Sequence, residues 1–200
     1  MNKLIAVILL ILLGPLFMLI AVAILCDTGR PILFVHRRAC QPSLYYQHGF
    51  ECLKFRTMLM EHNRARWSGL EPSWTLAQSD PRLTRVGAWL RRWSLDELPQ
   101  LLNIVIGEMN FIGPRPMLLH QDKQLAGWQI KRREVKSGIT GWAQIHGRNS
   151  IPWSERIRLD VWYVEHRSWR LDAYILWRTF IMWITGEGLY GKDGVNHDFA

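Results

Sequence analysis

The chain has 200 residues, 48% of them hydrophobic, and a formal net charge of +8 at pH 7. Its length allows one domain with a buried core and an appended membrane element. Its charge favours anionic partners: nucleic acid, lipid headgroups or phosphorylated small molecules. The three cysteines, Cys26, Cys40 and Cys52, are odd in number and form no C-x-x-C pair, which disfavours a disulfide framework and a cysteine-based metal site.

The N-terminal segment 4–25 contains 22 residues and no charge. As an α-helix it would be roughly 33 Å long, enough to cross a bilayer core of about 30 Å. Gly14 and Pro15 lie near its middle, and the proline predicts a kink because it removes a backbone donor and clashes with the preceding turn. Positive residues flank the segment on both sides, with Lys3 before it and Arg30 after it.

Two membrane arrangements fit this segment equally well on the residues alone. Because positive residues prefer the cytoplasmic side, a re-entrant helix that bends at Pro15 and returns to the same face satisfies both flanks. A straight span with the more basic flank inside is the alternative. A cleaved signal peptide ranks third, because apolar sequence continues past the candidate cleavage site at 21–23.

The remainder predicts a mostly helical α/β unit with no internal repeat. The eleven tryptophans favour contact with a membrane interface. The last apolar helix is too short to span a bilayer, so we expect it in the core or lying in that interface. The expected strands cover 31–34 and 52–56, the expected loops 39–50, 61–81 and 113–116, and the expected helices about 84–93, 94–106, 154–165 and 171–185.

The stretch R-R-W-S-L-D-E-L-P-Q (91–100) is the most informative for chemistry. Ser94 followed three residues later by Glu97 predicts a capping box, with Pro99 in the first helical turn. Asp96 would then lie at the positive end of a helix dipole, which favours its ionised form. An ionised carboxylate can attack phosphorus without a base, and the Asp96–Glu97 pair could hold Mg²⁺ together with substrate phosphates. The alternative is that both acids only cap a helix.

Basic residues elsewhere favour a phosphate site over a simple cap. Arg91 lies about one helical turn before Asp96, and Arg115 is held between two prolines, where a planar guanidinium is well placed to grip a phosphate. Further charge comes from Lys54, Arg56 and Arg148. For each of these side chains the alternative is a solvated surface position.

Four blocks resemble the bacterial sugar transferase family, the small monotopic phosphoglycosyl transferases that act on polyprenol phosphate. The most specific block is SDPRLTRVGAWLRRWSLDELPQLLNIVIGEMNFIGPRP (79–116). The others are KFRTM (54–58), GITGWAQIHGRN (138–149) and LDVWYV (159–164). They follow in order along nearly the whole chain.

The resemblance implies a compact α/β domain, mostly helical, embedded in one membrane leaflet. The family's first helix is re-entrant and broken at a central proline, which corresponds to Gly14-Pro15. Residues 1–30 would form this membrane helix, and 31–200 a catalytic domain with interfacial amphipathic helices. The expected location is the cytoplasmic face of the bacterial inner membrane.

The resemblance also implies a reaction. Asp96 would be the nucleophile, Glu97 would complete the catalytic pair, Mg²⁺ would be the cofactor, and Arg115 would hold substrate phosphate. A UDP-sugar would donate a sugar phosphate to undecaprenyl phosphate, releasing UMP, as the first membrane step of glycan assembly. The implied partners are these two substrates and membrane lipids, with no nucleic acid; homo-oligomerisation is left open.

Two other functions remain as alternatives on the sequence. A basic membrane-anchored protein could bind anionic lipid or nucleic acid without chemistry, with a strong salt dependence. A nucleotide-sugar phosphohydrolase would use water in place of the lipid acceptor and would form UMP without a lipid-linked product.

Overall fold

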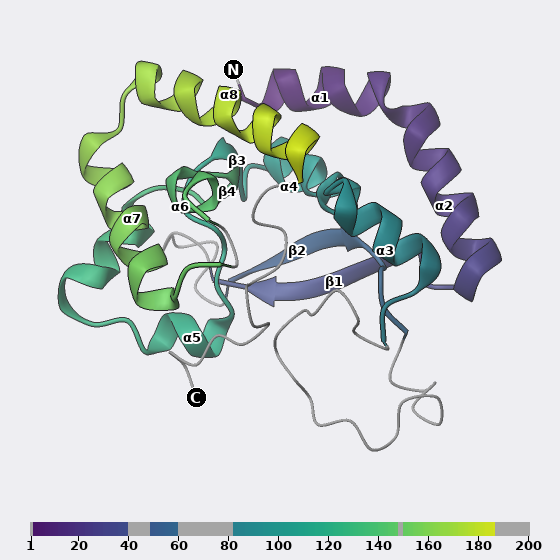
Figure 1. Cartoon of the computed structure of the whole chain (residues 1–200), viewed down its shortest axis with the longest axis horizontal. Helices are drawn as coiled ribbons and strands as arrows, with labels where there is room; N and C mark the ends of the chain where they lie inside the picture. The colour runs from purple at the N-terminus through teal and green to yellow at the C-terminus, as the bar shows by residue number, and fades with distance from the viewer. Residues whose placement is uncertain (1, 40–48, 60–81, 148–149, 187–200) are drawn as a thin grey trace.

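The computed structural model describes residues 2–39, 49–59, 82–147 and 150–186 (Figure 1). Most of these residues are helical, and they also form two small sheets, which confirms a mostly helical fold with some β structure. The α-helices are α1 (Asn2–Leu12), α2 (Gly14–Thr28), α3 (Arg85–Arg92), α4 (Gln100–Ile106), α5 (Leu119–Lys123), α6 (Trp142–Ile145), α7 (Trp153–His166) and α8 (Trp169–Thr185). The strands are β1 (Leu33–Arg38), β2 (Phe50–Phe55), β3 (Asn110–Ile112) and β4 (Gly138–Thr140), and the 3-10 helices are η2 (Leu95–Glu97) and η3 (Gly127–Glu134).

The predicted kink near Pro15 is present. α1 ends at Leu12, α2 begins at Gly14, and the two helices are bent by 61°. Proline is tolerated there because the first turn of a helix does not use its N–H groups within the helix. Among the described helices none is long and apolar enough to cross a membrane alone; α1 and α2 pass that test only as a bent pair.

Both ends of the bent pair are attached to the rest of the chain. At the start of α1, Asn2 Nδ2 donates to Asn110 Oδ1 at 3.1 Å. Just past the end of α2, Arg56 Nη2 donates to the carbonyl of Gly29 at 2.7 Å. The polypeptide therefore leaves and rejoins the same globular unit, with the bend between the two attachment points.

The inner side of the bent pair is packed and its outer side is not. α1 contributes Ala6 to a buried cluster with β2 and α4, and α2 contributes Ile20 and Ile24 to a cluster with β2 and α3. Large apolar side chains cover the outer side and are exposed: Leu4, Ile5, Ile8, Ile11, Leu12, Met18, Leu19 and Val22.

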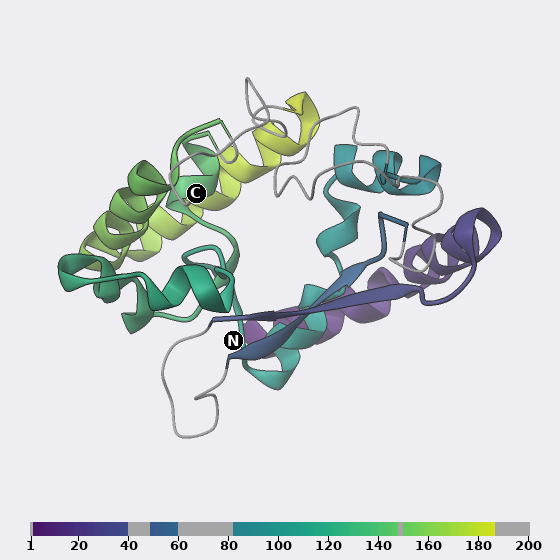
Figure 2. The same cartoon turned by 90° about the horizontal axis from the view of Figure 1, so that it is seen from below.

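α8 also presents an uncovered apolar face. α1 and α8 both lie along the upper edge of Figure 1, and in the view from below in Figure 2 α1 lies behind the hairpin and α8 behind α7. The two helices thus share one side of the molecule. The exposed apolar side chains of α8 are Trp169, Tyr174, Leu176, Trp177, Phe180, Trp183 and Ile184.

β1 and β2 form an antiparallel hairpin; β2 largely matches the strand expected at 52–56, whereas β1 shares only residues 33–34 with the strand expected at 31–34. Leu33 pairs with Phe55 at one end and Arg38 with Phe50 at the other. Phe50, Cys52 and Phe55 of β2 are buried, whereas β1 is mostly exposed. The hairpin therefore packs through β2, the strand that carries Lys54.

The expected helix at 94–106 is confirmed only in its second part. Its first residues form the short turn η2, and the α-helix α4 begins at Gln100. Gly107 ends α4 with a φ of 102°, as expected of a glycine after a helix. The expected helices near 84–93, 154–165 and 171–185 are α3, α7 and α8 with slightly shifted ends.

Asn103 joins α4 to β2 through its side chain and is 1% exposed. Its Oδ1 accepts from the N–H of Leu53 at 3.1 Å. Its Nδ2 donates to the carbonyl of Glu51 at 2.8 Å and to the carboxylate of Glu108 at 2.6 Å. One buried amide therefore satisfies backbone groups of β2 on the edge away from β1.

Replacing Asn103 with Leu should destabilise the fold, because it leaves buried polar groups of β2 without partners at a cost of about 3 kcal/mol. For a chain of this size the midpoint of thermal unfolding should fall by roughly 6–12 °C, measured in detergent micelles. Asn110→Ala, which removes only the bond to Asn2, is the control and should change the midpoint little. An equal shift in both variants would contradict this role of Asn103.

Candidate active site

A sharp turn after α3 places the two acidic residues. Ser94 has a φ of 52°, and its N–H donates to the carbonyl of Arg91 at 3.0 Å. The predicted capping box is wrong, because this left-handed backbone replaces the extended conformation of a helix N-cap and the Ser94 side chain makes no cap bond. Asp96 and Glu97 follow in η2, and both are buried.

Glu97 is fixed by two cations from different parts of the chain. Its Oε1 accepts from Lys54 Nζ of β2 at 2.7 Å and from Arg115 Nη2 at 2.8 Å, and Arg115 Nη1 lies 3.4 Å from its Oε2. Burial alone would raise the pKa of Glu97, but Arg115 and Lys54 outweigh it and hold that pKa well below its usual value. Glu97 is therefore ionised and bridges three segments.

Asp96 is in a different electrostatic state from Glu97. Burial raises the pKa of Asp96 above its usual value; Lys54 opposes this shift, as do Arg91 and Arg115, and the negative charge of Glu97 adds to it. The sequence predicted that a helix dipole would favour the ionised form of Asp96. That prediction is wrong, because burial raises the pKa of Asp96. Asp96 lies in a short 3-10 turn, and its charged form depends on the neighbouring cations.

Three of the predicted basic residues gather around this pair. Lys54 and Arg115 contact Glu97 directly. Arg91, near the end of α3, donates from Nε to Thr57 Oγ1 at 2.9 Å and lies close enough to Asp96 to lower its pKa. The grouping of positive charge about two adjacent carboxylates is therefore as the sequence suggested.

The other two basic candidates are not placed at the site. Arg56 is 3% exposed and points to the end of α2, where it donates to Thr28 Oγ1 and to the carbonyls of Arg30 and Gly29. Arg56 therefore holds the C-terminal end of the α1–α2 pair. Arg148 lies outside the described residues.

The G-P-R-P loop that carries Arg115 is held by backbone contact with β4. Gly113 donates to the carbonyl of Thr140 at 2.9 Å, and Gly138 donates to that of Pro114 at 3.0 Å. A Cβ on Gly138 would lie 2.1 Å from the nitrogen of Gly113. Both positions therefore require glycine because the two backbones touch.

The buried ion pair between Arg132 and Asp160 also supports the G-P-R-P loop. Arg132 Nη2 donates to Asp160 Oδ2 at 2.6 Å and to the carbonyl of Arg115 at 2.9 Å. The Arg132 and Asp160 side chains are 6% and 4% exposed. This pairing could not be predicted from the sequence: Asp160 stands in the LDVWYV block, but Arg132 lies 28 residues away and outside the four blocks.

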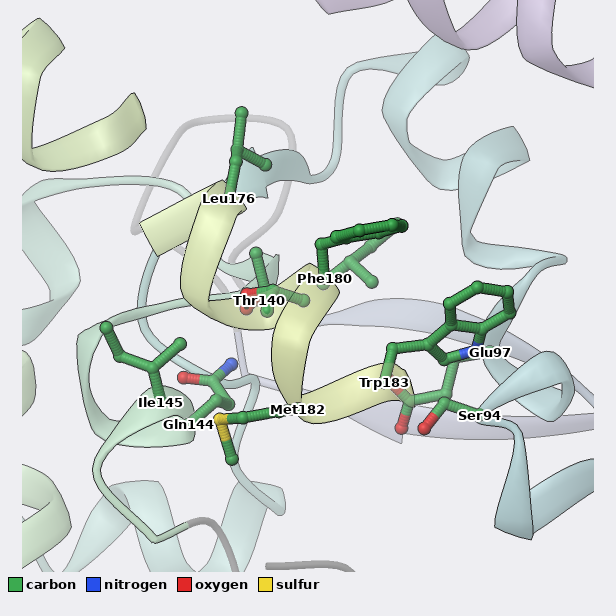
Figure 3. A pocket seen from close by; sticks show the side chains of 11 residues that line it. Ser94, Glu97, Thr140, Gln144, Ile145, Leu176, Phe180, Met182 and Trp183 are labelled. Atoms are coloured by element: carbon green, nitrogen blue, oxygen red, sulfur yellow. Dashed lines mark hydrogen bonds between the residues drawn. The ribbon is translucent and has the colours of Figure 1, made fainter. Parts of the chain in front are cut away.

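A cavity of about 270 Å³ opens beside Glu97 (Figure 3). Glu97 and Ser94 lie at one end of the picture and Gln144 and Ile145 at the other, with α8 side chains between them. The lining is mostly apolar: Ile139, Ile145, Leu176, Phe180, Met182 and Trp183. None of these side chains was singled out from the sequence as part of a site.

The carboxylate pair has the donor chemistry that Mg²⁺ prefers. The described residues contain no group of three or more His, Cys, Asp or Glu side chains that could hold a metal alone. Mg²⁺ commonly uses only one or two protein carboxylates and takes its other ligands from water and substrate phosphates. A divalent cation would also offset the burial and like charge that oppose ionisation of Asp96.

A buried carboxylate beside an ionised one, with Lys54, Arg91 and Arg115 around them, has the charges that transfer of a phosphorylated group requires. The profile of the bacterial sugar transferase family matches residues 1–186. The chain belongs to this family.

Individual relatives agree with this assignment. The sugar transferase EpsL of Bacillus subtilis is 40% identical over 180 residues, which is 84% of this chain and 85% of that protein. An undecaprenyl-phosphate glucose phosphotransferase of Komagataeibacter xylinus is 39% identical over 87% of this chain and 33% of its own length. A UDP-glucose:undecaprenyl-phosphate glucose-1-phosphate transferase of Escherichia coli is 34% identical over 92% of this chain and 39% of its own length. This chain thus spans well under half of the two relatives named for their reactions.

Removing one partner of the buried Arg132–Asp160 pair should destabilise the loop that carries Arg115. Asp160→Ala leaves the Arg132 charge buried and unpaired, which costs about 3–5 kcal/mol, so the chain should lose most of its thermal stability. Glu165→Ala, also on α7, removes the exposed contact with Lys131 and should leave stability unchanged. Thermal unfolding of both variants in detergent checks this, and equal stability of the two would contradict the supporting role.

Proposed function

We propose that this protein transfers a sugar 1-phosphate from a UDP-sugar to undecaprenyl phosphate and releases UMP. The observation that carries the proposal is the buried Asp96 beside Glu97, with Lys54 and Arg115 on the second carboxylate. The names of the Komagataeibacter and Escherichia relatives support the acceptor, and that of the Escherichia relative supports a UDP-linked donor.

In the first step the Asp96 carboxylate attacks the β-phosphorus of the donor. An oxygen–phosphorus bond to Asp96 forms, the bond between the two phosphates breaks, and UMP leaves with its electron pair. In the second step a phosphate oxygen of the lipid attacks the same phosphorus and displaces Asp96. The lipid then carries the sugar through a diphosphate, and the carboxylate is regenerated.

The basic side chains act on charge during both steps. Lys54, Arg91 and Arg115 lower the pKa of Asp96, so they favour the ionised form that attacks. Arg115 is 41% exposed in its side chain although it bonds Glu97, which leaves part of its guanidinium available to a phosphate oxygen. Such preplaced cations stabilise the charge that develops on a transferring phosphoryl group.

We propose Mg²⁺ as the cofactor, held by Asp96 and Glu97 together with substrate phosphates. Bound there, the ion would neutralise phosphate charge and polarise the phosphorus–oxygen bonds.

We further propose that the protein is monotopic, with the α1–α2 pair re-entering the cytoplasmic face of the inner membrane. The attachment of both ends of the pair to the same globular unit supports this arrangement. So do the exposed apolar faces of α1 and α8 on one side of the molecule, the exposed apolar side chains of α2, and the positive residues on both flanks of the pair. Tryptophan-rich helices such as α8 suit the membrane–water interface.

The Asp96→Asn variant should lower UMP release by about three orders of magnitude or more, because it removes the nucleophile. The assay uses nanodiscs with Mg²⁺, undecaprenyl phosphate and a panel of UDP-sugars, and follows both UMP and lipid-linked sugar. EDTA should abolish both products and added Mg²⁺ should restore them. Asp122→Asn, which alters a carboxylate bound to Arg133, is the control and should remain active.

Each other outcome identifies a different function. Full turnover by Asp96→Asn would exclude the covalent mechanism. UMP without a lipid product would indicate a phosphohydrolase. No UMP with any donor, but salt-dependent lipid binding, would indicate a binding protein.

The membrane arrangement predicts that both chain ends face the cytoplasm. A cysteine added before Met1 or after Ala200, in a background with the native cysteines changed to serine, should react with an impermeant maleimide in inverted vesicles and not in spheroplasts. Pro15→Leu favours one continuous helix and should expose the N-terminal cysteine, but not the C-terminal one, in spheroplasts. Labelling of the wild-type N-terminus from the periplasmic side would show a spanning helix instead.

A further inference from the structure

Gln144 is a buried polar residue that the mechanism does not use. It lies in α6 and is 4% exposed. Within the part of the chain that the structure describes, neither its Nε2 nor its Oε1 has a hydrogen-bond partner. Because an unpaired buried amide is costly, most such groups in folded proteins are paired. The carboxamide of Gln144 is therefore suited to a ligand that brings both a donor and an acceptor.

Gln144 lines two cavities. One is the cavity of about 270 Å³ with Glu97 at its other end (Figure 3). The second is about 40 Å³ and is lined by Arg115, Arg132 and Arg156 together with Gln144. The larger cavity thus has the carboxamide at one end and, at the other, Glu97 with Arg115 bonded to it at 2.8 Å, where phosphates would meet positive charge.

The larger cavity is apolar apart from its two ends. Its hydroxyl groups on Thr140 and Thr179 bond each other at 2.6 Å, and Thr179 also donates to the carbonyl of Ile175. Ile145 and Met182 supply apolar surface beside Gln144, and Phe180 lines the cavity nearer Glu97 and Trp183. This lining suits a planar ring with one polar edge. A hydrocarbon chain would leave the carboxamide unpaired, and a sugar would bury several hydroxyls against apolar walls.

We propose that Gln144 binds the nucleobase of the donor and contacts the imide edge of a uracil. The ring N3–H would donate to Oε1 and a ring carbonyl would accept from Nε2, while Ile145 and Met182 pack against the ring. Proteins commonly read a base in this way, through its pairing edge and apolar contacts on its faces. This inference rests on the proposed function, because it assumes that the donor is a uridine nucleotide whose phosphates lie at Asp96.

Direct binding of UMP tests the proposal without requiring turnover. Calorimetry in nanodiscs compares UMP with N3-methyl-UMP, which lacks the N3–H donor, on the wild-type protein and on Gln144→Leu. The wild-type protein should bind N3-methyl-UMP about tenfold or more weakly than UMP, because one good hydrogen bond in a buried site has about that effect. Gln144→Leu should bind UMP about tenfold more weakly than the wild type and should not distinguish the two ligands.

Two further variants keep the result interpretable. Gln124→Leu changes an exposed glutamine after α5 and should bind UMP as the wild type does. Gln144→Glu keeps the shape of the side chain but loses its donor, and should also weaken UMP binding about tenfold. This variant keeps the test possible if Gln144→Leu fails to fold.

The proposal is overturned if both Gln144 variants bind UMP like the wild type, or if Gln144→Leu still discriminates against N3-methyl-UMP. It is also overturned if they raise the KM for undecaprenyl phosphate and leave UMP binding unchanged, since Gln144 would then belong to the acceptor site. Failure of the proposed function is a separate result: the wild-type protein would form no lipid-linked sugar, whatever its affinity for UMP.

Discussion

The active site depends on one ionised carboxylate, that of Glu97. It joins Lys54 of the hairpin, the turn after α3, and the G-P-R-P loop through Arg115. A buried charge is tolerated only when paired and hydrogen-bonded, so these three segments are constrained to meet at Glu97. Asp96 is placed by the same constraint, because it lies in the turn that Glu97 fixes. Lys54 and Arg115, which bind Glu97, also oppose the rise that burial causes in the pKa of Asp96. The two adjacent acids thus differ: Glu97 joins three segments, and Asp96 is the residue that we propose as the nucleophile.

The G-P-R-P loop beside this centre is held by contacts with residues that are not part of the carboxylate pair or its cations. Arg115 is directed by contact between the backbones at Gly113 and Gly138 and by the bond from Arg132 to its own carbonyl. Arg132 is in turn neutralised by Asp160 of α7. A guanidinium that must meet both Glu97 and a phosphate gains from such support, because small displacements of a catalytic group have large effects on rate.

Local patterns in the sequence predicted what local chemistry determines. The break at Pro15, the end of α4 at Gly107 and the carboxylate pair beside Arg91 all follow from neighbouring residues. The capping box predicted at Ser94 was wrong, because the turn and not the side chain determines the backbone angle of Ser94. Lys54 and Arg56 looked equivalent on the expected strand, but Arg56 lies past the end of β2 and turns to α2. Asn103, Asp160 and Gln144 stand in the blocks that resemble the family, but their roles were not predicted, because these come from distant partners or from burial beside a cavity.

α8 connects the apolar surface of the protein to the chemistry. Trp183 Nε1 donates to the carbonyl of Trp93 at 2.6 Å, so the end of α8 is bonded to the turn that precedes Asp96. Met182 and Phe180 of the same helical turn line the cavity beside Glu97, while Trp177 and Ile184 are exposed. A helix that lies in a membrane interface through one face would therefore hold the catalytic turn with the other. In the membrane arrangement that we propose, membrane association and the position of Asp96 would then depend on the same helix.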